Sequence, residues 1–404
     1  MNLKNHSTIA LGYFLIIAFL GVLLRLFHVI DVPINYKYIV HAHSHIALLG
    51  WIYTAITTLI YYAYLREKPI SKKYKKLFWI TQFTLIGMLI SFPITGYALL
   101  SILFSTLFLI ASYWFFWFVN KHIPTEQKNT NSFKLVKAGL WFMILSSVGP
   151  WTLGIIMNTL GASSIWYRIS IYFYLHFQYN GWFIVTLFGL FFYILEQQNI
   201  KVSKSLFKQF YWLLIVSIIL TFFLSVLWTK PHTIFYTLGT IGALLQFLSF
   251  WYFIKLLKPI KLAAIFSKNI LNLLILVGFL FVIKMTLQLV GSVPFFADSI
   301  ATNIDLLIGY IHWTFLGVVS IAILGFLKHF KMIRLTNKVY HLYLIGFILT
   351  EGLIFYKGIT HWIKGVVVEK YDVYLAAVSI WFFIAISLIF LMQFKKSKTF
   401  EKQI

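Results

Sequence analysis

The stretch IALGYFLIIAFLGVLLRLFHVI, residues 9–30, decides the fold class of this chain. Arg25 is its only formally charged residue, and a membrane-spanning helix needs about 20 largely apolar residues. The run is longer than the apolar core of a signal peptide, and no small-residue cleavage pattern follows it. We therefore expect it to form the first membrane span rather than a removable leader.

Comparable apolar runs recur along the whole sequence. The 404 residues are 61% hydrophobic and 11% charged, whereas about a quarter of the residues of a soluble domain are charged. We expect an all-α polytopic membrane protein, folded as a single transmembrane domain over residues 1–404 and without an obvious internal repeat. Its twelve spans are predicted at 8–30, 38–65, 77–95, 97–120, 133–158, 166–196, 207–229, 232–256, 269–292, 303–328, 337–357 and 373–394.

The basic residues predict the orientation of these spans. The chain has 34 Lys and Arg residues against 10 Asp and Glu residues, a formal charge of +24. The basic residues cluster in every second connection, which is typical of cytoplasmic loops facing anionic lipid and does not require a nucleic-acid partner. We expect both termini to be cytoplasmic and the protein to reside in the inner (cytoplasmic) membrane, with basic segments at 66–76, 121–137, 201–208, 255–268, 328–338 and 395–398.

Cysteine is absent from the sequence. This absence excludes disulfide bonds, thiolate metal sites and the covalent attachment of a c-type haem.

Histidines mark three of the predicted spans at similar depth. His41, His43 and His45 open the second span, His176 lies in the sixth and His312 lies early in the tenth. Under the predicted orientation all three spans run from outside to inside. At about 1.5 Å per helical residue, His45 and His312 are expected about 10 Å inside the outer ends of their helices.

Imidazole in hydrocarbon needs a partner, which is either a neighbouring helix or a metal. Neutral imidazole is also a common axial ligand of haem iron. We expect His45 and His312 to hold a low-spin, bis-histidine haem b from two helices. His41 and His43 remain alternatives for the first ligand, because His41 and His45 share one helix face and His43 points elsewhere.

Three motifs resemble the core subunit of the haem-copper oxidases, the superfamily of the cytochrome oxidases and nitric oxide reductases. They are HAHSHIALLGW at 41–51, LHFQYNGWF at 175–183 and GYIHWTFLG at 309–317. The resemblance implies a low-spin haem between the second and tenth spans. It also implies copper or non-haem iron near His176, electron transfer or the handling of nitric oxide or oxygen, and electron-donor subunits as partners.

The sequence also departs from that family. Tyr310 stands where the ligand of a high-spin haem is expected, and the predicted seventh span has no histidine. Only His232 follows that span. We therefore expect a divergent relative with an incomplete binuclear centre, assign it no catalytic residue, and do not expect it to reduce oxygen to water.

Two charged residues lie deep in predicted spans. Lys284 is in the ninth span and Glu351 in the eleventh, where they form either a proton or ion route or a mutual ion pair. Together with His176 they suggest an alternative function, a secondary transporter; a non-catalytic scaffold subunit is a third. Arg25 and Arg168 lie towards outer helix ends, where they either bind haem propionates or extend to lipid headgroups.

Overall fold

The computed structural model describes residues 2–395 and is built of helices without strands over that range. Within residues 2–395, twelve helical segments are long and apolar enough to cross a membrane, which confirms the predicted span count. They are Leu3–Leu26 (α1), Tyr36–Tyr64 (α2, η1, α3), Ser71–Thr95 (α4), Leu99–His122 (α5), Asn131–Thr159 (α6, α7), Ile165–Gln197 (α8, η3, α9), Lys204–Thr229 (α10, η4), Thr233–Leu257 (α11), Lys268–Val290 (α13), Ile304–His329 (α15, η5, α16), Asn337–Trp362 (α17) and Tyr371–Leu391 (α18).

The predicted boundaries agree with these segments to within a few residues. The largest differences are at the start of α4, at the end of α17 and in α1, which begins and ends earlier than predicted. The short helices α12 (Leu262–Ile265) and α14 (Pro294–Thr302) lie in connections and were not predicted. Pro294 occupies the first turn of α14, where its missing N–H would have no helical partner anyway.

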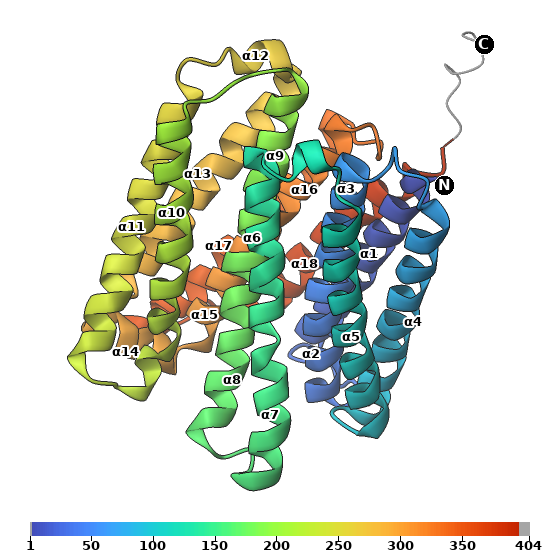
Figure 1. Cartoon of the computed structure of the whole chain (residues 1–404). Coiled ribbons are helices and arrows are strands. Elements are labelled where there is room, and N and C mark those ends of the chain that lie inside the picture. The colour runs from blue at the N-terminus through green and yellow to red at the C-terminus, as the bar shows by residue number, and fades with distance from the viewer. Residues whose placement is uncertain (1, 396–404) are drawn as a thin grey trace.

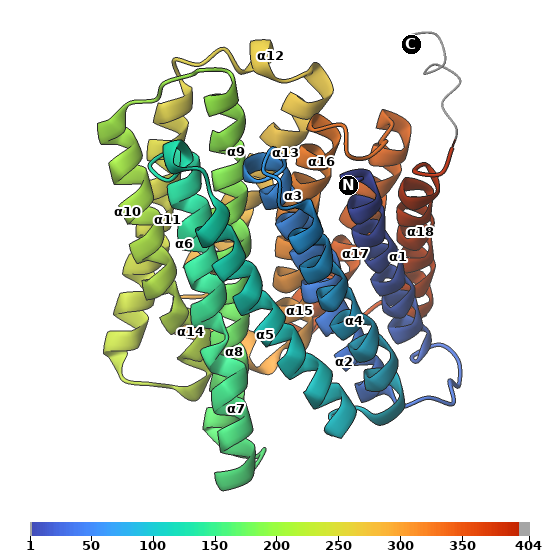
Figure 2. The same ribbon diagram turned by 45° about the vertical axis from the view of Figure 1, so that its right-hand side comes forward.

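Both ends of the described chain lie on the same side of the bundle (Figures 1 and 2). This side also carries α12, whereas α14 lies at the opposite side. The arrangement follows from an even number of spans.

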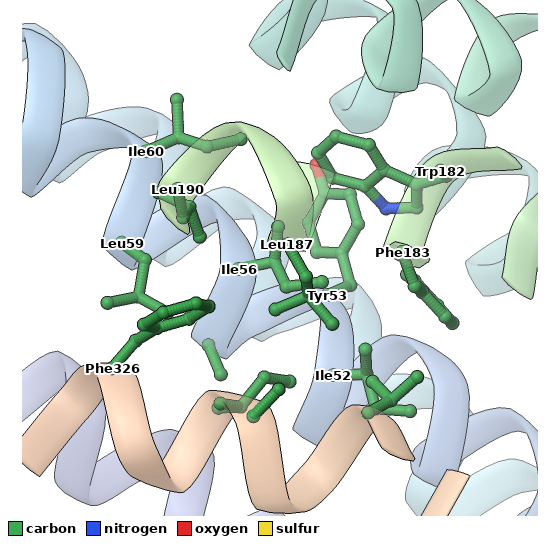
Figure 3. Packing of buried hydrophobic residues seen from close by; sticks show 14 of the residues in the cluster. Ile52, Tyr53, Ile56, Leu59, Ile60, Trp182, Phe183, Leu187, Leu190 and Phe326 are labelled. Carbon is green, nitrogen blue, oxygen red and sulfur yellow. The ribbon is translucent and has the colours of Figure 1, made fainter. Parts of the chain in front are cut away.

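The second, sixth and tenth spans form the centre of the bundle. In the most apolar window of the second and sixth spans 89% of residues are buried inside the protein, against 33–50% in the other ten. Figure 3 shows the packing between these spans: Ile56 and Leu59 from the second span lie beside Leu187 and Leu190 of α9 and Phe326 of α16. The histidine-bearing second and sixth spans are thus the helices most shielded from lipid.

Each central span contains an eight-residue π-helical segment that begins directly after a histidine. These segments are η1 (Ile46–Tyr53) after His45, η3 (Phe177–Ile184) after His176 and η5 (Trp313–Ser320) after His312. The fifth residue after each of these histidines is a glycine, so the three spans share a short motif, although no internal repeat was obvious from the sequence. π-helical turns are rare and often occur at functional sites.

The glycines of this repeat allow close helix packing. A Cβ atom on Gly50 would lie 2.9 Å from the Tyr13 side chain, and one on Gly181 would lie 2.5 Å from Phe142. Small residues let membrane helices approach in this way without loss of contact area. The π segments therefore fix how α1 and α6 pack against the centre.

Candidate functional site

His43 and His312 face each other from two different spans. Their ring centroids are 6.4 Å apart, and the ring planes are inclined by 59°. A metal–nitrogen bond to histidine is about 2 Å long, so two imidazoles on opposite sides of one metal ion have centroids about 6 Å apart. The observed separation therefore fits a single metal ion between the two rings.

The remaining nitrogen of His43 is held by the backbone. Its Nδ1–H donates to the carbonyl oxygen of Ile17 in α1 at 3.0 Å. Gly21, one turn further along α1, leaves space for this ring: a Cβ there would lie 3.4 Å from His43 Cε1. The hydrogen bond fixes the neutral tautomer in which Nε2 carries the free lone pair.

The remaining nitrogen of His312 faces a carboxylate. Nδ1 lies 3.4 Å from Oε1 of Glu351 in α17, in an ion-pair contact that is not aligned as a hydrogen bond. Glu351 is only 1% exposed, and neither of its oxygens receives a hydrogen bond within residues 2–395. A carbonyl or carboxylate behind the outer ring nitrogen is the usual support of a metal-bound histidine.

Within the described part of the chain, no hydrogen bond reaches Nε2 of either ring. The Nε2 atoms of this pair are therefore without a protein hydrogen-bond partner among the described residues, and the two rings are neighbours. The same part of the chain contains no cluster of three or more His, Asp or Glu side chains that could hold a metal ion. Two ligands are too few for a simple tetrahedral ion, but they suffice for haem iron, to which the porphyrin supplies four further nitrogens.

His41 and His45 lie on a different face of α2, as their spacing predicted. Both rings pack against Phe92 and Tyr97. His45 Nδ1–H donates to the carbonyl oxygen of His41 at 2.8 Å, and Tyr97 OH donates to His45 Nε2 at 3.1 Å. With both nitrogens of His45 engaged, the structure brings His43, rather than the preferred His45, to His312.

His176 lies in a second polar cluster, at the start of η3. Its Nε2–H donates to the carbonyl oxygen of Ile218 in α10 at 2.8 Å. Its Nδ1 lies 3.3 Å from Asn180 Nδ2 and 3.3 Å from Ser225 Oγ. Both nitrogens of this buried ring are therefore hydrogen-bonded to protein groups. This is the arrangement expected of a membrane histidine that pairs with neighbouring helices and binds no metal.

Lys284 extends the His176 cluster. Its Nζ donates to Asn180 Oδ1 and to Gln288 Oε1. The lysine is fully buried. Its polar partners are two neutral amides, and a buried amine without a counter-charge depends on such hydrogen bonds.

Lys284 and Glu351 thus have separate partners. Lys284 contacts the His176 cluster, whereas Glu351 contacts His312. The transporter alternative placed His176, Lys284 and Glu351 in one site. The structure instead divides these residues between two clusters.

The other predicted contacts are distributed as follows. Arg25 lies near enough to His43 and Glu351 to act on both electrostatically, whereas Arg168 packs over the Trp228 ring at 4.1 Å. His232 caps the N-terminus of α11 through Ile234 N, away from His176, and His361 lies 3.6 Å from Asp305. Arg25 therefore remains the basic residue best placed to reach an anionic group on a ligand of His43.

Several members of these clusters were not predicted from the sequence. Asn180 and Gln288 each follow their partners, His176 and Lys284, by four residues, and this helical spacing was the signal that could have revealed them. The carbonyl partners of His43 and His176 carry no sequence signal. They are backbone groups of α1 and α10 and become known only from the packing of the helices.

Comparison with protein-family models and with curated protein sequences finds no match to this chain. The resemblance to the haem-copper oxidases therefore rests on the quoted motifs and on the placement of their histidines.

Proposed function

We propose that this chain is a b-type haem membrane protein that transfers electrons through a bis-histidine haem held by His43 and His312. The observation that carries the proposal is the facing pair of rings at 6.4 Å, each with Nε2 free and Nδ1 next to a carbonyl or carboxylate oxygen. The haem is bound non-covalently in this proposal, because the chain has no cysteine to attach it as a c-type haem.

Occupied axial positions favour electron transfer over gas binding. A haem iron with two imidazole ligands has no open coordination site, so a diatomic molecule cannot bind without displacing a histidine. The reduction potential of such a haem is set by its axial ligands and by the groups hydrogen-bonded to them. Ile17 and Glu351 would exert this influence here, and Arg25 would neutralise a propionate.

The His176 cluster does not support a second metal. Three imidazoles are the usual set for copper in this superfamily, and His176 has Asn180, Ser225 and a backbone carbonyl as neighbours instead. We propose that the protein belongs with the haem-copper oxidases as a divergent relative that retains only the low-spin haem.

The proposal is tested by measuring haem content. Cells supplied with haem precursor should yield purified protein with about one haem b per chain, by the pyridine haemochrome assay, and His312→Ala should yield none. Metal analysis of the same wild-type sample should show no stoichiometric copper. A wild-type protein that inserts in the membrane and carries no haem would contradict the proposal.

We also propose that the side of the bundle carrying residues 2 and 395 faces the cytoplasm, because the basic segments adjoin it. The natural absence of cysteine makes this easy to test. A cysteine introduced at Lys72 should react with a membrane-impermeant maleimide only after cells are opened. Labelling in intact cells would show that this side of the bundle faces outward, opposite to the proposed orientation.

A further inference from the structure

A large cavity lies on the membrane-facing side of the bundle, and its lining residues do not include His43, His312, His176 or Lys284. It has a volume of about 820 Å³ and is enclosed by α9, α11, α13 and α16. Ile275 and Phe279 of α13, at its edge, are 62% and 61% exposed. Since these side chains face the hydrocarbon, the cavity opens sideways into the membrane rather than into water.

The lining of this cavity is apolar except at one end. Phenylalanines from several helices form its interior, among them Phe188, Phe250 and Phe281. Apart from the indole of Trp251, the only polar side chains that line it among the described residues are those of Lys255 and Lys258, in the last turn of α11 and directly after it. The cavity is thus a hydrocarbon-like chamber with a basic rim.

The rim belongs to a strongly basic segment. Residues 255–268 contain four lysines and no aspartate or glutamate. Lys255 Nζ lies 3.5 Å above the Trp251 ring, which holds its charge at the mouth of the cavity. Lysines at this level of a membrane attract the phosphate groups of anionic lipids.

We propose that the cavity binds one anionic phospholipid, with an acyl chain in the chamber between α11 and α13 and its phosphate on Lys255 and Lys258. The apolar lining matches the acyl chain of such a lipid, and the basic rim matches its phosphate. A quinone fits less well, because its carbonyl oxygens need hydrogen-bond donors and the interior of the chamber lacks them among its lining residues. The proposal does not depend on the presence of haem.

Two independent changes test the two parts of the site. Gly278 lines the chamber, and a Cβ there would meet only Phe250 Cζ at 3.8 Å, so Gly278→Leu can add a side chain at this wall of the chamber. Its matched control is Gly352→Leu in α17, where nothing lies within 4 Å of the added Cβ. The rim is tested by Lys255→Gln with Lys258→Gln.

The matched control for the rim is Lys134→Gln with Lys137→Gln. These two lysines are exposed on the first turns of α6, within another predicted cytoplasmic basic segment. The pair removes the same charge from the same side of the protein without touching the cavity.

Native mass spectrometry of the full-length protein, with phosphatidylglycerol or phosphatidylcholine added to the detergent, provides the measurement. We expect one phosphatidylglycerol per chain, retained about tenfold more strongly than phosphatidylcholine. Gly278→Leu should lose retention of both lipids, the rim variant should lose only the preference for phosphatidylglycerol, and both controls should behave as wild type. Equal retention of the two lipids by wild type, or the same loss in a control variant, would overturn the proposal.

Discussion

His43 and His176 are both buried in central spans, yet their ring nitrogens are used in opposite ways. His43 donates Nδ1–H to a backbone carbonyl and leaves Nε2 free towards His312. His176 donates Nε2–H to a backbone carbonyl, and its Nδ1 meets Asn180 and Ser225. The two histidines therefore differ in the partners of their ring nitrogens.

Lys284 and Glu351, the charged residues beside these histidines, also differ in whether they have hydrogen-bond partners. Lys284 has two amide oxygens as hydrogen-bond acceptors, so the His176 cluster is complete as it stands. Among the described residues Glu351 has only the misaligned contact with His312, so the other cluster contains buried polar atoms without partners. Unsatisfied buried polar groups in a native fold require an explanation, and a bound group that reorients His312 provides one.

The largest expected effect separates His43 from its neighbour His45. His43→Ala should abolish the haem absorption band, because it removes one of the two axial ligands. His45→Ala is the matched control on the same helix and should retain the band, since both nitrogens of His45 have other partners. His176→Ala should also retain it. Visible spectra of the purified variants, normalised to protein, provide the measurement.

Loss of haem in His45→Ala with retention in His43→Ala would exchange the roles of the two residues. Size-exclusion profiles must match wild type for each variant, so that a missing band reports a missing ligand rather than a misfolded protein.

A smaller effect tests whether Lys284 in the His176 cluster serves to stabilise the fold. Asn180→Leu leaves the buried amine with one acceptor fewer and should lower the free energy of unfolding by about 2–3 kcal/mol. Lys284→Met removes the charge at similar volume and should lower it by about 1 kcal/mol. Denaturant unfolding in detergent measures both, and neither variant should change the haem content. A gain in stability in Lys284→Met would contradict a packing role for the amine.

The smallest effect concerns Glu351. A carboxylate behind His312 makes the imidazole a stronger donor and stabilises ferric haem, so Glu351→Gln should raise the reduction potential by some tens of millivolts. Glu196→Gln is the matched control, because Glu196 accepts hydrogen bonds from Ser132 far from the histidine pair. A redox titration followed by visible absorption measures the shift. An unchanged reduction potential in Glu351→Gln would show that Glu351 does not influence the haem.

The sequence was sufficient to predict the twelve spans, because each is an apolar run of about the length a bilayer requires. It also predicted that the second and tenth spans would carry the facing histidines, since helical rise converts residue number into depth. The choice between His43 and His45 was not predictable. Residues two apart on a helix point in nearly opposite directions, and only the packing of α1, α4 and α15 shows which direction leads to His312.

The π-helical segments were beyond prediction for a different reason. No residue type strongly favours a π-helix, so η1, η3 and η5 arise from the way the three central spans pack together. Ser225 was missed as a partner of His176 because it lies in another span, in the largely apolar stretch 222–229.

The assignment of His43 and His312 as the two axial ligands of one haem has a direct spectroscopic test. Electron paramagnetic resonance of the oxidised, purified wild-type protein reports both the spin state and the axial ligands of the iron. We predict a low-spin ferric signal of the kind given by two imidazole ligands. A high-spin signal, or no haem iron in haem-supplied protein, would contradict the assignment.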